Sequence, residues 1–358
     1  MKTLARRRKK TSRQSITDFA KRLLAEWCGL NLPVLNARVI LAASGGADST
    51  ALLLGLDELI KANRLAVTLT VAHLDHSLRK TSKADAQWLK NLANELGHEV
   101  VTRRANIKRL ASETSDNLEQ AARRARYDFL KILAKRNGST LILTAHTLDD
   151  QAETILLRLL RGSAAEGLSG TSPVRELERD SKVKLVRPLL SWARRADTES
   201  YCGVRQVEFR VDEMNEDEAF ARVRVRKQLL PLMKSFNNRI VEGLSRTATL
   251  LNEDATVLSD QAKRLLEVAS QSSGQNSETK TPSLSVDILL EAPAAVRRRA
   301  LREWILRSRG DLRRVEMVHL FAVEALLNGG RGGRVAELPG GMKVTRRKGV
   351  LELSHKRG

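Results

Sequence analysis

Aromatic residues and cysteines are scarce in this chain of 358 residues. Phe, Trp and Tyr together make up 3% of the sequence, too few for the broad platforms on which many proteins stack single-stranded nucleic acid. Cys28 and Cys202 are the only cysteines, and they form no CxxC pair. Two isolated thiols provide no disulfide framework, so we expect a reducing compartment, the cytoplasm.

Long apolar runs are also absent. No run approaches the ~18 apolar residues of a membrane helix, so we expect no association with a membrane. The first ten residues are basic but lead into no apolar segment, and we expect that they are not a secretory signal. We interpret them as a flexible basic arm that touches either RNA or nothing, with an organellar transit peptide as the alternative.

Basic residues, in contrast, are plentiful. The chain has 63 Lys and Arg against 42 Asp and Glu, a net charge of +21, which indicates a polyanionic partner such as nucleic acid. From Val296 onward, sixteen basic residues stand against six acidic ones. Because aromatics are few, binding is expected to depend on phosphates and shape. The alternative is an ordinary solvated surface.

The segment VILAASGGADSTALLLGL, residues 39–56, joins two apolar patterns through a turn of small residues. Val39–Ala43 is continuously apolar, which predicts a strand buried on both faces. After the turn, leucines recur at helical spacing. The first N–H groups of that helix would point into the turn, where Gly45 and Gly46 let the backbone approach a bulky anion. The pattern therefore predicts an anion site.

The residues of this turn exclude two familiar phosphate loops. No Gly-Lys-Ser/Thr occurs in the chain, and the spaced glycines of a dinucleotide-binding turn are missing. Ser-Gly-Gly-x-Asp-Ser instead resembles the pyrophosphate loop (PP-loop) of the N-type ATP pyrophosphatases. The resemblance implies that Asp48 helps to hold Mg²⁺ and that the ATP phosphates bind to the whole loop: Ser44, Gly45, Gly46, Ala47, Asp48 and Ser49. The alternative is a structural turn rich in small residues.

Strand and helix patterns alternate up to about residue 205. Strands are expected at 65–74, 99–102 and 140–145, and helices at 83–96, 117–135 and 148–160. This alternation predicts parallel βαβ units, with ligands bound where strands end and helices begin. We therefore expect an α/β, parallel-sheet domain of the PP-loop (adenine nucleotide alpha hydrolase-like) class. A helical domain and a small α+β C-terminal region are expected to follow it.

Changes in composition predict four parts in the chain. These are a basic arm and helix (1–30), a catalytic domain (31–215), a helical accessory region (216–310) and a small basic domain (311–358). The polar residues 270–282 are expected to form a flexible linker. Helical patterns at 237–269, 294–309 and 313–327 precede short predicted strands within 334–353.

Two motifs place charge near the predicted ligand edge. In LEQAARRARYDFL, Arg123 and Arg126 share one helix face with Glu119 and could point at phosphates, although an ordinary salt-bridged face is the alternative. In AHLDHSLRKTSKAD, His73 and His76 with one carboxylate make a poor zinc site.

The motif TAHTLDDQAET, residues 144–154, follows another predicted strand. His146, Asp150 and Glu153 fall on one helical face at the ligand edge of the sheet. Their carboxylates could serve Mg²⁺ or grip an ammonium group. For Asp149 alone, favourable interaction with the helix dipole is a sufficient alternative.

Taken in order, these motifs resemble the tRNA(Ile)-lysidine synthase family. The resemblance covers residues 39–232 and includes LRGSAAEGLSG and VRPLL. It implies ligation of free L-lysine to the wobble cytidine, position 34, of tRNA(Ile) with a CAU anticodon. In that family ATP adenylates the C2 oxygen of the cytidine, and the lysine ε-amine then displaces AMP. The accessory domains would grip the tRNA body.

The resemblance also implies roles for residues of the motifs. His146 would lie beside the nucleotide. Asp150 and Glu153 would receive the lysine, whose ammonium groups need acidic partners. Arg123 and Arg126 would stabilise negative charge at the phosphates or at the adenylated base.

A run of arginines after residue 212 extends the resemblance. Arg222, Arg224 and Arg226 would face the active site or the tRNA, although a solvated helix face is the alternative. The chain departs from the family pattern at Val223, where the family often has Asn, and at Ser77, where it has Gly.

Two other functions fit parts of the pattern. A PP-loop tRNA thiolase shares the loop and the basic surface, but its sulfur transfer uses cysteines near the active site, and this chain has no CxxC. A non-catalytic tRNA-binding protein on the same fold is the second alternative, against which the acidic residues of the AHTLDDQAET motif speak. The sequence does not determine the oligomeric state, for which a homodimer is one alternative.

Overall fold

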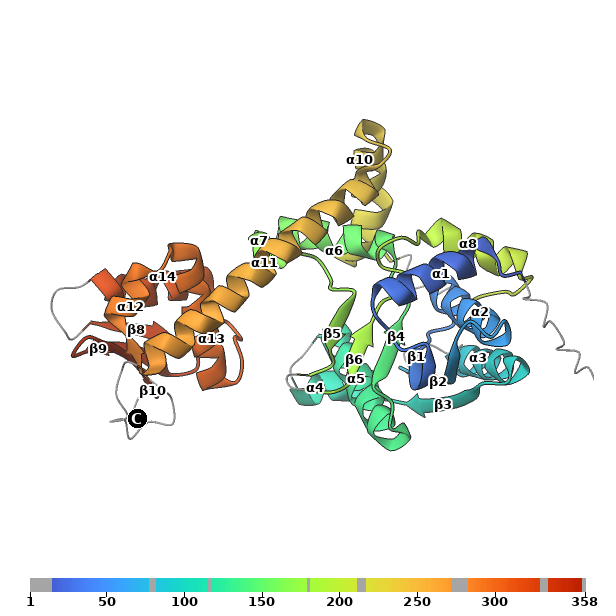
Figure 1. Cartoon of the computed structure of the whole chain (residues 1–358), viewed down its shortest axis with the longest axis horizontal. Coiled ribbons are helices and arrows are strands. Elements are labelled where there is room, and N and C mark those ends of the chain that lie inside the picture. The colour runs from blue at the N-terminus through green and yellow to red at the C-terminus, as the bar shows by residue number, and fades with distance from the viewer. Residues whose placement is uncertain are drawn as a thin grey trace, which may run out of the picture. The chain divides into compact units, whose positions relative to one another are not determined.

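The computed structural model describes residues 15–76, 82–114, 117–178, 181–210, 217–271, 283–328 and 334–355. The chain forms two compact units, Met1–Thr249 and Leu250–Gly358 (Figure 1). The four-part division stays a prediction, because its boundaries rest on composition alone.

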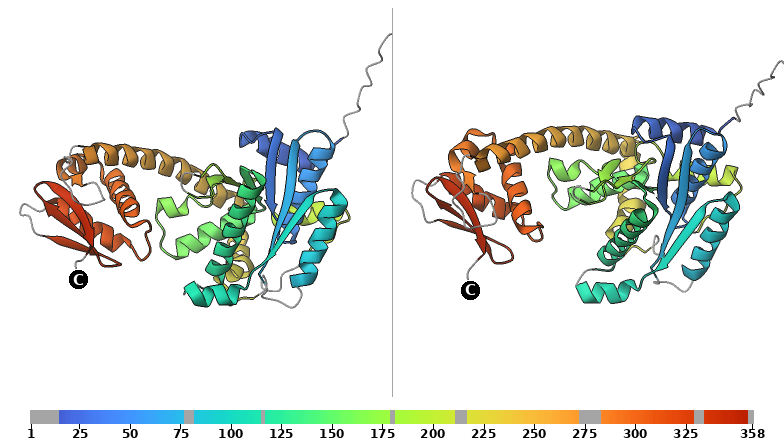
Figure 2. Two further views of the ribbon diagram at one scale, coloured as in Figure 1. Left: turned by 90° about the horizontal axis from the view of Figure 1, so that it is seen from below. Right: turned by 60° about the horizontal axis from the view of Figure 1, so that its bottom comes forward.

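A six-stranded sheet forms the centre of the N-terminal unit, in the order β3-β2-β1-β4-β6-β5 (Figure 2). Neighbouring strands pair in parallel, except that β5 pairs antiparallel with β6. The strands are β1 (Leu35–Ala42), β2 (Ala66–Asp75), β3 (Glu99–Arg104), β4 (Leu141–Thr144), β5 (Val174–Glu176) and β6 (Lys184–Val186). Because β1 lies between β2 and β4, the strand order reverses there, and the loops after β1 and β4 flank a switch point where such sheets bind ligands.

Helices cover both faces of this sheet. On one face lie α1 (Asp18–Gly29), α2 (Ala47–Lys61), α3 (Ser82–Leu96) and α8 (Arg195–Val204). On the other lies α5 (Leu118–Asn137), against which α4 (Ile107–Thr114) packs. Strand β1 is buried on both sides: Val39 and Leu41 join the first core and Ile40 joins the second. This explains the uninterrupted apolar run in its sequence.

Four short or irregular helices lie outside the sheet, one before β5 and three after α8. These are α7 (Ala165–Leu168), α9 (Ala221–Arg224), the π-helical turn η2 (Val225–Leu229) and α10 (Leu230–Phe236). They accompany α6 (Leu148–Leu160), whose Leu148, Ala152 and Leu156 share a core with Val225 and Leu230. Pro231 has no backbone N–H to continue the helical ladder, which favours an irregular turn just before it. Residues of α9 and η2 are thereby held along α6.

The C-terminal unit has its own small sheet. Helix α11 (Ile240–Gln271) begins in the N-terminal unit and ends in this one. The antiparallel sheet has the order β7-β10-β9-β8, formed by β7 (Leu284–Ser285), β8 (Val335–Leu338), β9 (Met342–Arg347) and β10 (Val350–His355). It packs with α12 (Val286–Glu291), α13 (Ala294–Arg309), α14 (Met317–Ala325) and the turn η3 (Leu326–Asn328) around a core that includes Trp304 and Val344.

The predicted fold class is confirmed, and most predicted elements agree with the structure within a few residues. The helix expected over 313–327 was wrong at its start, because Arg314 adopts a positive φ of 59° and α14 begins only at Met317. The linker expected over 270–282 was wrong at its first two residues, which belong to α11. Its remainder, the basic arm and Ser77 lie outside the described residues.

No helix within the described ranges has both the length and the apolar character that crossing a membrane requires.

Candidate active site

The turn between β1 and α2 is organised by the hydroxyl of Ser49. It accepts hydrogen bonds from the backbone N–H groups of Ser44 (3.2 Å) and Gly45 (3.1 Å) and donates one to the carbonyl of Gly46 (3.1 Å). Gly45 has a φ of +89°, and a Cβ there would lie 3.5 Å from the Trp88 ring. Glycine is favoured at such a φ because it has no Cβ. The turn leads directly into α2, whose first N–H groups face it.

A cavity of about 300 Å³ opens at the sheet edge beside this turn. Ser44, Asp48 and Ser49 line it from the turn, Arg126 from α5, and His146 from the loop after β4. Five residues predicted from separate motifs therefore meet in one cavity at the switch point of the sheet.

His73, Asp75 and His76 also line this cavity. The ring Nδ1 of His73 lies 2.9 Å from the carbonyl oxygen of Ala43, so His73 fixes the end of β1. Asp75 pairs with Arg104 at 3.6 Å. Among the described residues, no group of three or more His, Cys, Asp and Glu side chains could hold a metal ion by itself.

Asp48 is the acidic residue of the turn. Its Oδ1 accepts a hydrogen bond of 2.5 Å from the Thr198 hydroxyl, and its Oδ2 lies 3.9 Å from Nε of Arg195. Burial raises the pKa of Asp48 to about 6, although the Thr198 hydrogen bond opposes the shift. This carboxyl therefore changes its charge near pH 6.

Asp150 and Glu153 form an ion-pair cluster with two of the predicted arginines. Arg222 lies 2.8 Å from Asp150 and 2.6 Å from Glu153, and Nε of Arg226 lies 2.6 Å from Glu153. Glu153 is fully buried. Burial opposes both guanidinium charges, yet the two carboxylates outweigh it and raise the pKa of Arg222 and of Arg226. The cluster is thus a compact arrangement of both signs of charge.

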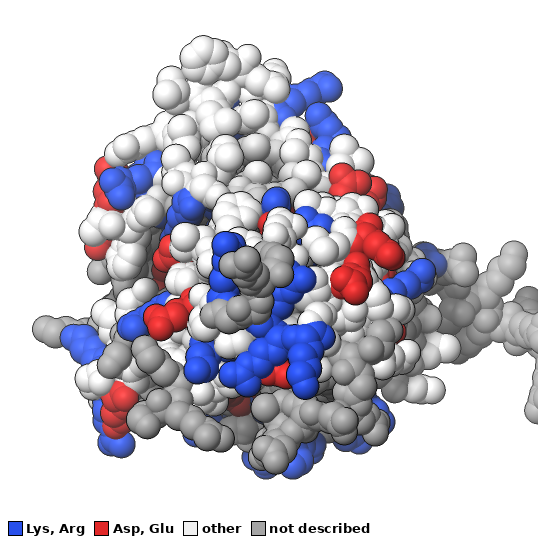
Figure 3. All heavy atoms as spheres, turned by 90° about the vertical axis from the view of Figure 1, so that its left-hand side faces the viewer, with Lys and Arg blue, Asp and Glu red and all other residues white. Residues whose placement is uncertain are grey.

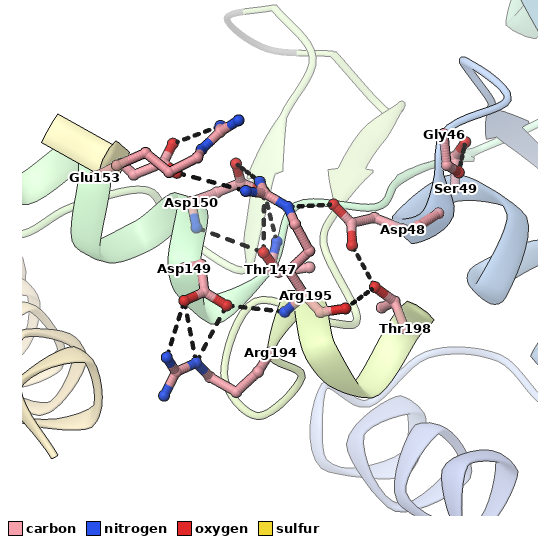
Figure 4. A network of polar contacts seen from close by, with 12 residues as sticks. Gly46, Asp48, Ser49, Thr147, Asp149, Asp150, Glu153, Arg194, Arg195 and Thr198 are labelled. Carbon is pink, nitrogen blue, oxygen red and sulfur yellow. Dashed lines mark hydrogen bonds and ion pairs between the residues drawn. The ribbon is translucent and has the colours of Figure 1, made fainter. Parts of the chain in front are cut away.

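Arg195 joins this cluster to the turn of residues 44–49 between β1 and α2, the phosphate loop. Its guanidinium lies 3.9 Å from Asp48, 3.8 Å from Asp150 and 3.9 Å from Glu153. Figure 4 shows Arg195 between Asp48 and Asp150. Arg195 and Thr198 were not predicted from the sequence. Their position just after the last sheet strand, at the start of a helix, is the signal that could have found them.

Asp149 on α6 is held by hydrogen bonds from the start of α8. It accepts hydrogen bonds from Nε of Arg194 and from the backbone N–H of Arg195, at 3.1 Å and 2.8 Å. Arg194 also pairs with Glu242 at 2.6 Å. These contacts tie α6 to α8 and to the start of α11, so they hold the surrounding helices in place.

His146 is kept uncharged at neutral pH. Its Nδ1 lies 2.9 Å from the Thr144 hydroxyl. Burial lowers the pKa of His146 to about 4; Asp150 opposes this shift, and nearby arginines add to it. His146 can therefore act beside a ligand as a neutral hydrogen-bonding group.

Three other predicted residues neither line the cavity nor join the ion-pair cluster. Arg123 lies over the Tyr127 ring, 5.0 Å from its centroid, and is not among the residues that line the cavity. Arg224 is exposed on the side of its helix away from Arg222. Ala47 begins α2, and its carbonyl accepts a weak hydrogen bond from the Cys202 thiol at 3.6 Å.

Comparisons with known proteins agree with this architecture. The PP-loop domain family matches residues 10–233, and the TilS substrate binding domain family matches residues 284–351. The U34-tRNA thiolase NcsA from Methanococcus maripaludis superposes with a TM-score of 0.53 at 15% identity, over 65% of this chain and 79% of that chain. This likeness shows a shared fold.

Several tRNA(Ile)-lysidine synthases are similar in sequence. The chain is 39% identical to that of Geobacter sulfurreducens and 40% identical to that of Thermus thermophilus, over 86% and 88% of its own length. It spans 63% and 56% of the lengths of those two proteins. It is 36% identical to that of Salinispora tropica over 87% of this chain and 89% of that protein. The chain therefore belongs to the tRNA(Ile)-lysidine synthase family.

Proposed function

We propose that the chain ligates free L-lysine to C2 of the cytidine at position 34 of tRNA(Ile) with a CAU anticodon. The observation that carries the proposal is that Arg195 lies between Asp48 of the phosphate loop and the cluster that contains Asp150 and Glu153. An ATP site and a site for an amino acid are then neighbours, as a two-step ligation requires.

The proposed reaction has two balanced steps. In the first, the C2 oxygen of the cytidine attacks the α-phosphate of ATP, an O–P bond forms and pyrophosphate leaves. In the second, the neutral ε-amine of lysine attacks C2, a C–N bond forms, the C2–O bond breaks and AMP leaves. The amine loses a proton as lysidine forms.

The phosphate loop is the proposed ATP site. Backbone N–H groups at the start of α2 would bind the phosphates, and neutral His146 would lie beside the nucleotide. Mg²⁺ is commonly held by one or two carboxylates together with substrate phosphates. A single Asp48 fits this mode, and when bound the ion would offset charge on the pyrophosphate leaving group.

The ion-pair cluster is the proposed lysine site. It consists of Asp150, Glu153, Arg222 and Arg226. A free amino acid carries a carboxylate and ammonium groups, so it needs cations and anions close together. Arg222 and Arg226 would pair with its carboxylate, while Asp150 and Glu153 would receive an ammonium group. Their present ion pairs keep these four side chains in place when lysine is absent.

Arg126 is the proposed stabiliser of the charge that develops during adenylation. Its side chain lines the cavity from α5 and approaches His76 at 3.3 Å. A guanidinium placed there could bind the phosphate that is transferred to the base. Because Arg123 is not part of the cavity lining, we assign this role to Arg126 alone.

Basic surface is the proposed contact with the body of the tRNA. Figure 3 shows one face of the molecule on which Lys and Arg side chains gather near the centre. The match of residues 284–351 to a substrate binding domain and the basic excess beyond Val296 both support a role of the C-terminal unit in holding tRNA. We place the reaction in the cytoplasm, where its tRNA substrate would be found.

The thiolase alternative needs a reactive thiol near the loop. Cys202 is buried, and burial raises its pKa to about 11, so its thiolate is scarce at neutral pH. Cys28 is exposed on α1. Neither observation favours sulfur transfer.

Pyrophosphate release tests the proposed function. We expect release from ATP only when the tRNA(Ile) transcript is present, and AMP release only when lysine is added as well. Release that needs a sulfur donor instead of lysine would favour the thiolase. An absence of any release, with tRNA binding retained, would favour the non-catalytic alternative.

A further inference from the structure

Two arginines lie against the ring of Tyr127 on α5. The guanidinium carbon of Arg123 is 5.0 Å from the ring centroid, and that of Arg175 on β5 is 5.4 Å from it. Arg175 is also anchored to the backbone, because it donates to the carbonyl of Glu176 at 2.7 Å. Side chains from two separate elements are therefore brought together on one aromatic ring.

A third arginine lies near the same ring, because its charge acts on the Tyr127 phenol. Arg187 follows β6 and is only 2% exposed. One of its terminal nitrogens donates to the carbonyl of Ser172 at 2.5 Å, while its Nε has no hydrogen-bond partner in the described part of the chain. Burial lowers the pKa of Arg187 to about 10, so it still carries its charge at neutral pH.

Acidic partners for this arginine cluster are missing. Within the described ranges, no Asp or Glu forms an ion pair with Arg123, Arg175 or Arg187. Burying a charge without a counter-ion is costly, and a donor without an acceptor adds to that cost. The Tyr127 phenol compensates in part: burial disfavours its ionisation, but the three arginines outweigh burial and lower its pKa.

The position of the cluster distinguishes it from the ATP cavity. Arg123, Tyr127, Arg175 and Arg187 are not among the residues that line that cavity. Strand β5, which carries Arg175, lies at the edge of the sheet. Arg187 nevertheless helps to lower the pKa of His146, so the cluster is a close neighbour of the reacting groups. An anion held there would belong to a molecule that extends beyond the cavity.

We propose that Arg123 and Arg175 bind a phosphodiester of the tRNA backbone close to the nucleotide that reacts, with the buried Arg187 supplying further positive charge. Guanidinium groups suit this ligand because their paired donors match two phosphate oxygens. Such a contact fixes the register of the RNA without reading its sequence. The inference rests on the proposed function only in taking tRNA as the substrate.

The salt dependence of tRNA binding tests the site. We would measure the affinity of Arg175→Gln for the unmodified tRNA(Ile) transcript over a series of salt concentrations, and its affinity for ATP separately. Loss of one phosphate contact reduces the slope of log K against log salt by about 0.7 to 0.9. The matched control is Arg109→Gln, because Arg109 is an exposed arginine of α4 that already pairs with Glu113 at 2.7 Å.

We expect the slope to fall in Arg175→Gln, with weaker tRNA binding and unchanged ATP affinity, while Arg109→Gln behaves like the parent protein. An unchanged slope in Arg175→Gln would overturn the inference. So would a loss of ATP affinity without a change in tRNA binding, since the anion would then be a nucleotide phosphate. Because the assay measures binding alone, its outcome does not depend on whether lysine is transferred.

The phenol of Tyr127 provides a second measurement in the unaltered protein. The chain has two tyrosines, and burial together with Glu58 raises the pKa of Tyr201. The first phenol to ionise in an ultraviolet titration is therefore Tyr127. Inorganic phosphate bound to the arginines should offset their charge and raise its pKa. No shift, or an equal shift in sodium chloride of the same ionic strength, would contradict a phosphate site.

Discussion

The hydroxyl of Thr198 donates a hydrogen bond of 2.5 Å to the carboxylate of Asp48, although the two residues lie 150 positions apart in the sequence. This bond joins the first turn of α8 to the phosphate loop. It also favours the ionised form of Asp48 against the effect of burial. The charge state of the loop therefore depends on a residue outside it.

Removal of this hydrogen bond should move the acid limb of the pH profile. If ionised Asp48 is needed, activity of the parent protein falls off near pH 6. In Thr198→Val the pKa of Asp48 should rise by roughly one to two units, since a hydrogen bond to a charged group contributes about 1.5 to 3 kcal/mol. Thr249→Val is the control, because Thr249 is an exposed residue whose hydroxyl bonds within its own helix. An identical acid limb in both variants would contradict the role of Thr198.

Loss of the Asp48 charge should separate turnover from binding. We expect Asp48→Asn to lose turnover while its affinity for tRNA stays near that of the parent, because the basic surface is unchanged. Asp260→Asn, at an exposed position on α11, should retain both. A large loss of tRNA affinity in folded Asp48→Asn protein would contradict this division.

The same variant should alter stability in a pH-dependent way. The folded-state pKa of Asp48, about 6, lies above its ordinary value of 3.8, so its protonation stabilises the fold below about pH 4 and this contribution is lost as the pH rises through 6. Asp48→Asn avoids the buried charge. It should exceed the parent in free energy of unfolding by about 3 kcal/mol at pH 8, and the difference should disappear near pH 4. Urea titrations at both pH values measure this; a constant difference would contradict it.

The buried carboxylate of Glu153 should matter for stability as well as for lysine. Glu153→Gln leaves Arg222 and Arg226 short of a counter-charge. Because breaking a buried ion pair is strongly destabilising, the free energy of unfolding should fall by about 3 to 5 kcal/mol. Glu113→Gln breaks an exposed pair with Arg109 and should cost less than about 1 kcal/mol. Chemical denaturation of both variants provides the comparison. Equal losses would show that the buried cluster contributes no more than a surface pair.

His146 should stay neutral throughout the working range. Burial lowers its pKa to about 4, so its imidazole signals in NMR spectra should not titrate between pH 5.5 and 8. His146→Asn, compared with the parent spectrum, identifies those signals. A midpoint near 6.5 would show that His146 is solvated and could carry a proton in the reaction.

Local patterns were sufficient to predict most of the N-terminal fold. The apolar run of β1 and the leucine spacing of α2 each reflect burial within a few residues, so both elements were expected. Strands β5 and β6 were not, because three residues each are too short to show a periodicity. The late start of α14 depends on the positive φ of Arg314, which no side-chain pattern indicates.

The candidate site was predictable where motifs lie at strand ends. Asp48, His146 and Arg126 were expected from their own segments, and they do line one cavity. Arg195 and Thr198 were missed because their contacts are made across long stretches of chain. Arg222 and Arg226 both pair with Glu153. They lie four residues apart on one helix face while Arg224 lies on the other, so helical periodicity could have indicated which arginines enter the site.

The central claim is that lysine becomes joined to one cytidine of one tRNA. The most direct test supplies ATP and labelled lysine with an unmodified tRNA(Ile) transcript that has a CAU anticodon, beside a transcript in which C34 is replaced by U. We predict label in the first transcript only, located at position 34. Equal labelling of both, or labelling of neither while ATP is still cleaved in a tRNA-dependent way, would contradict the account.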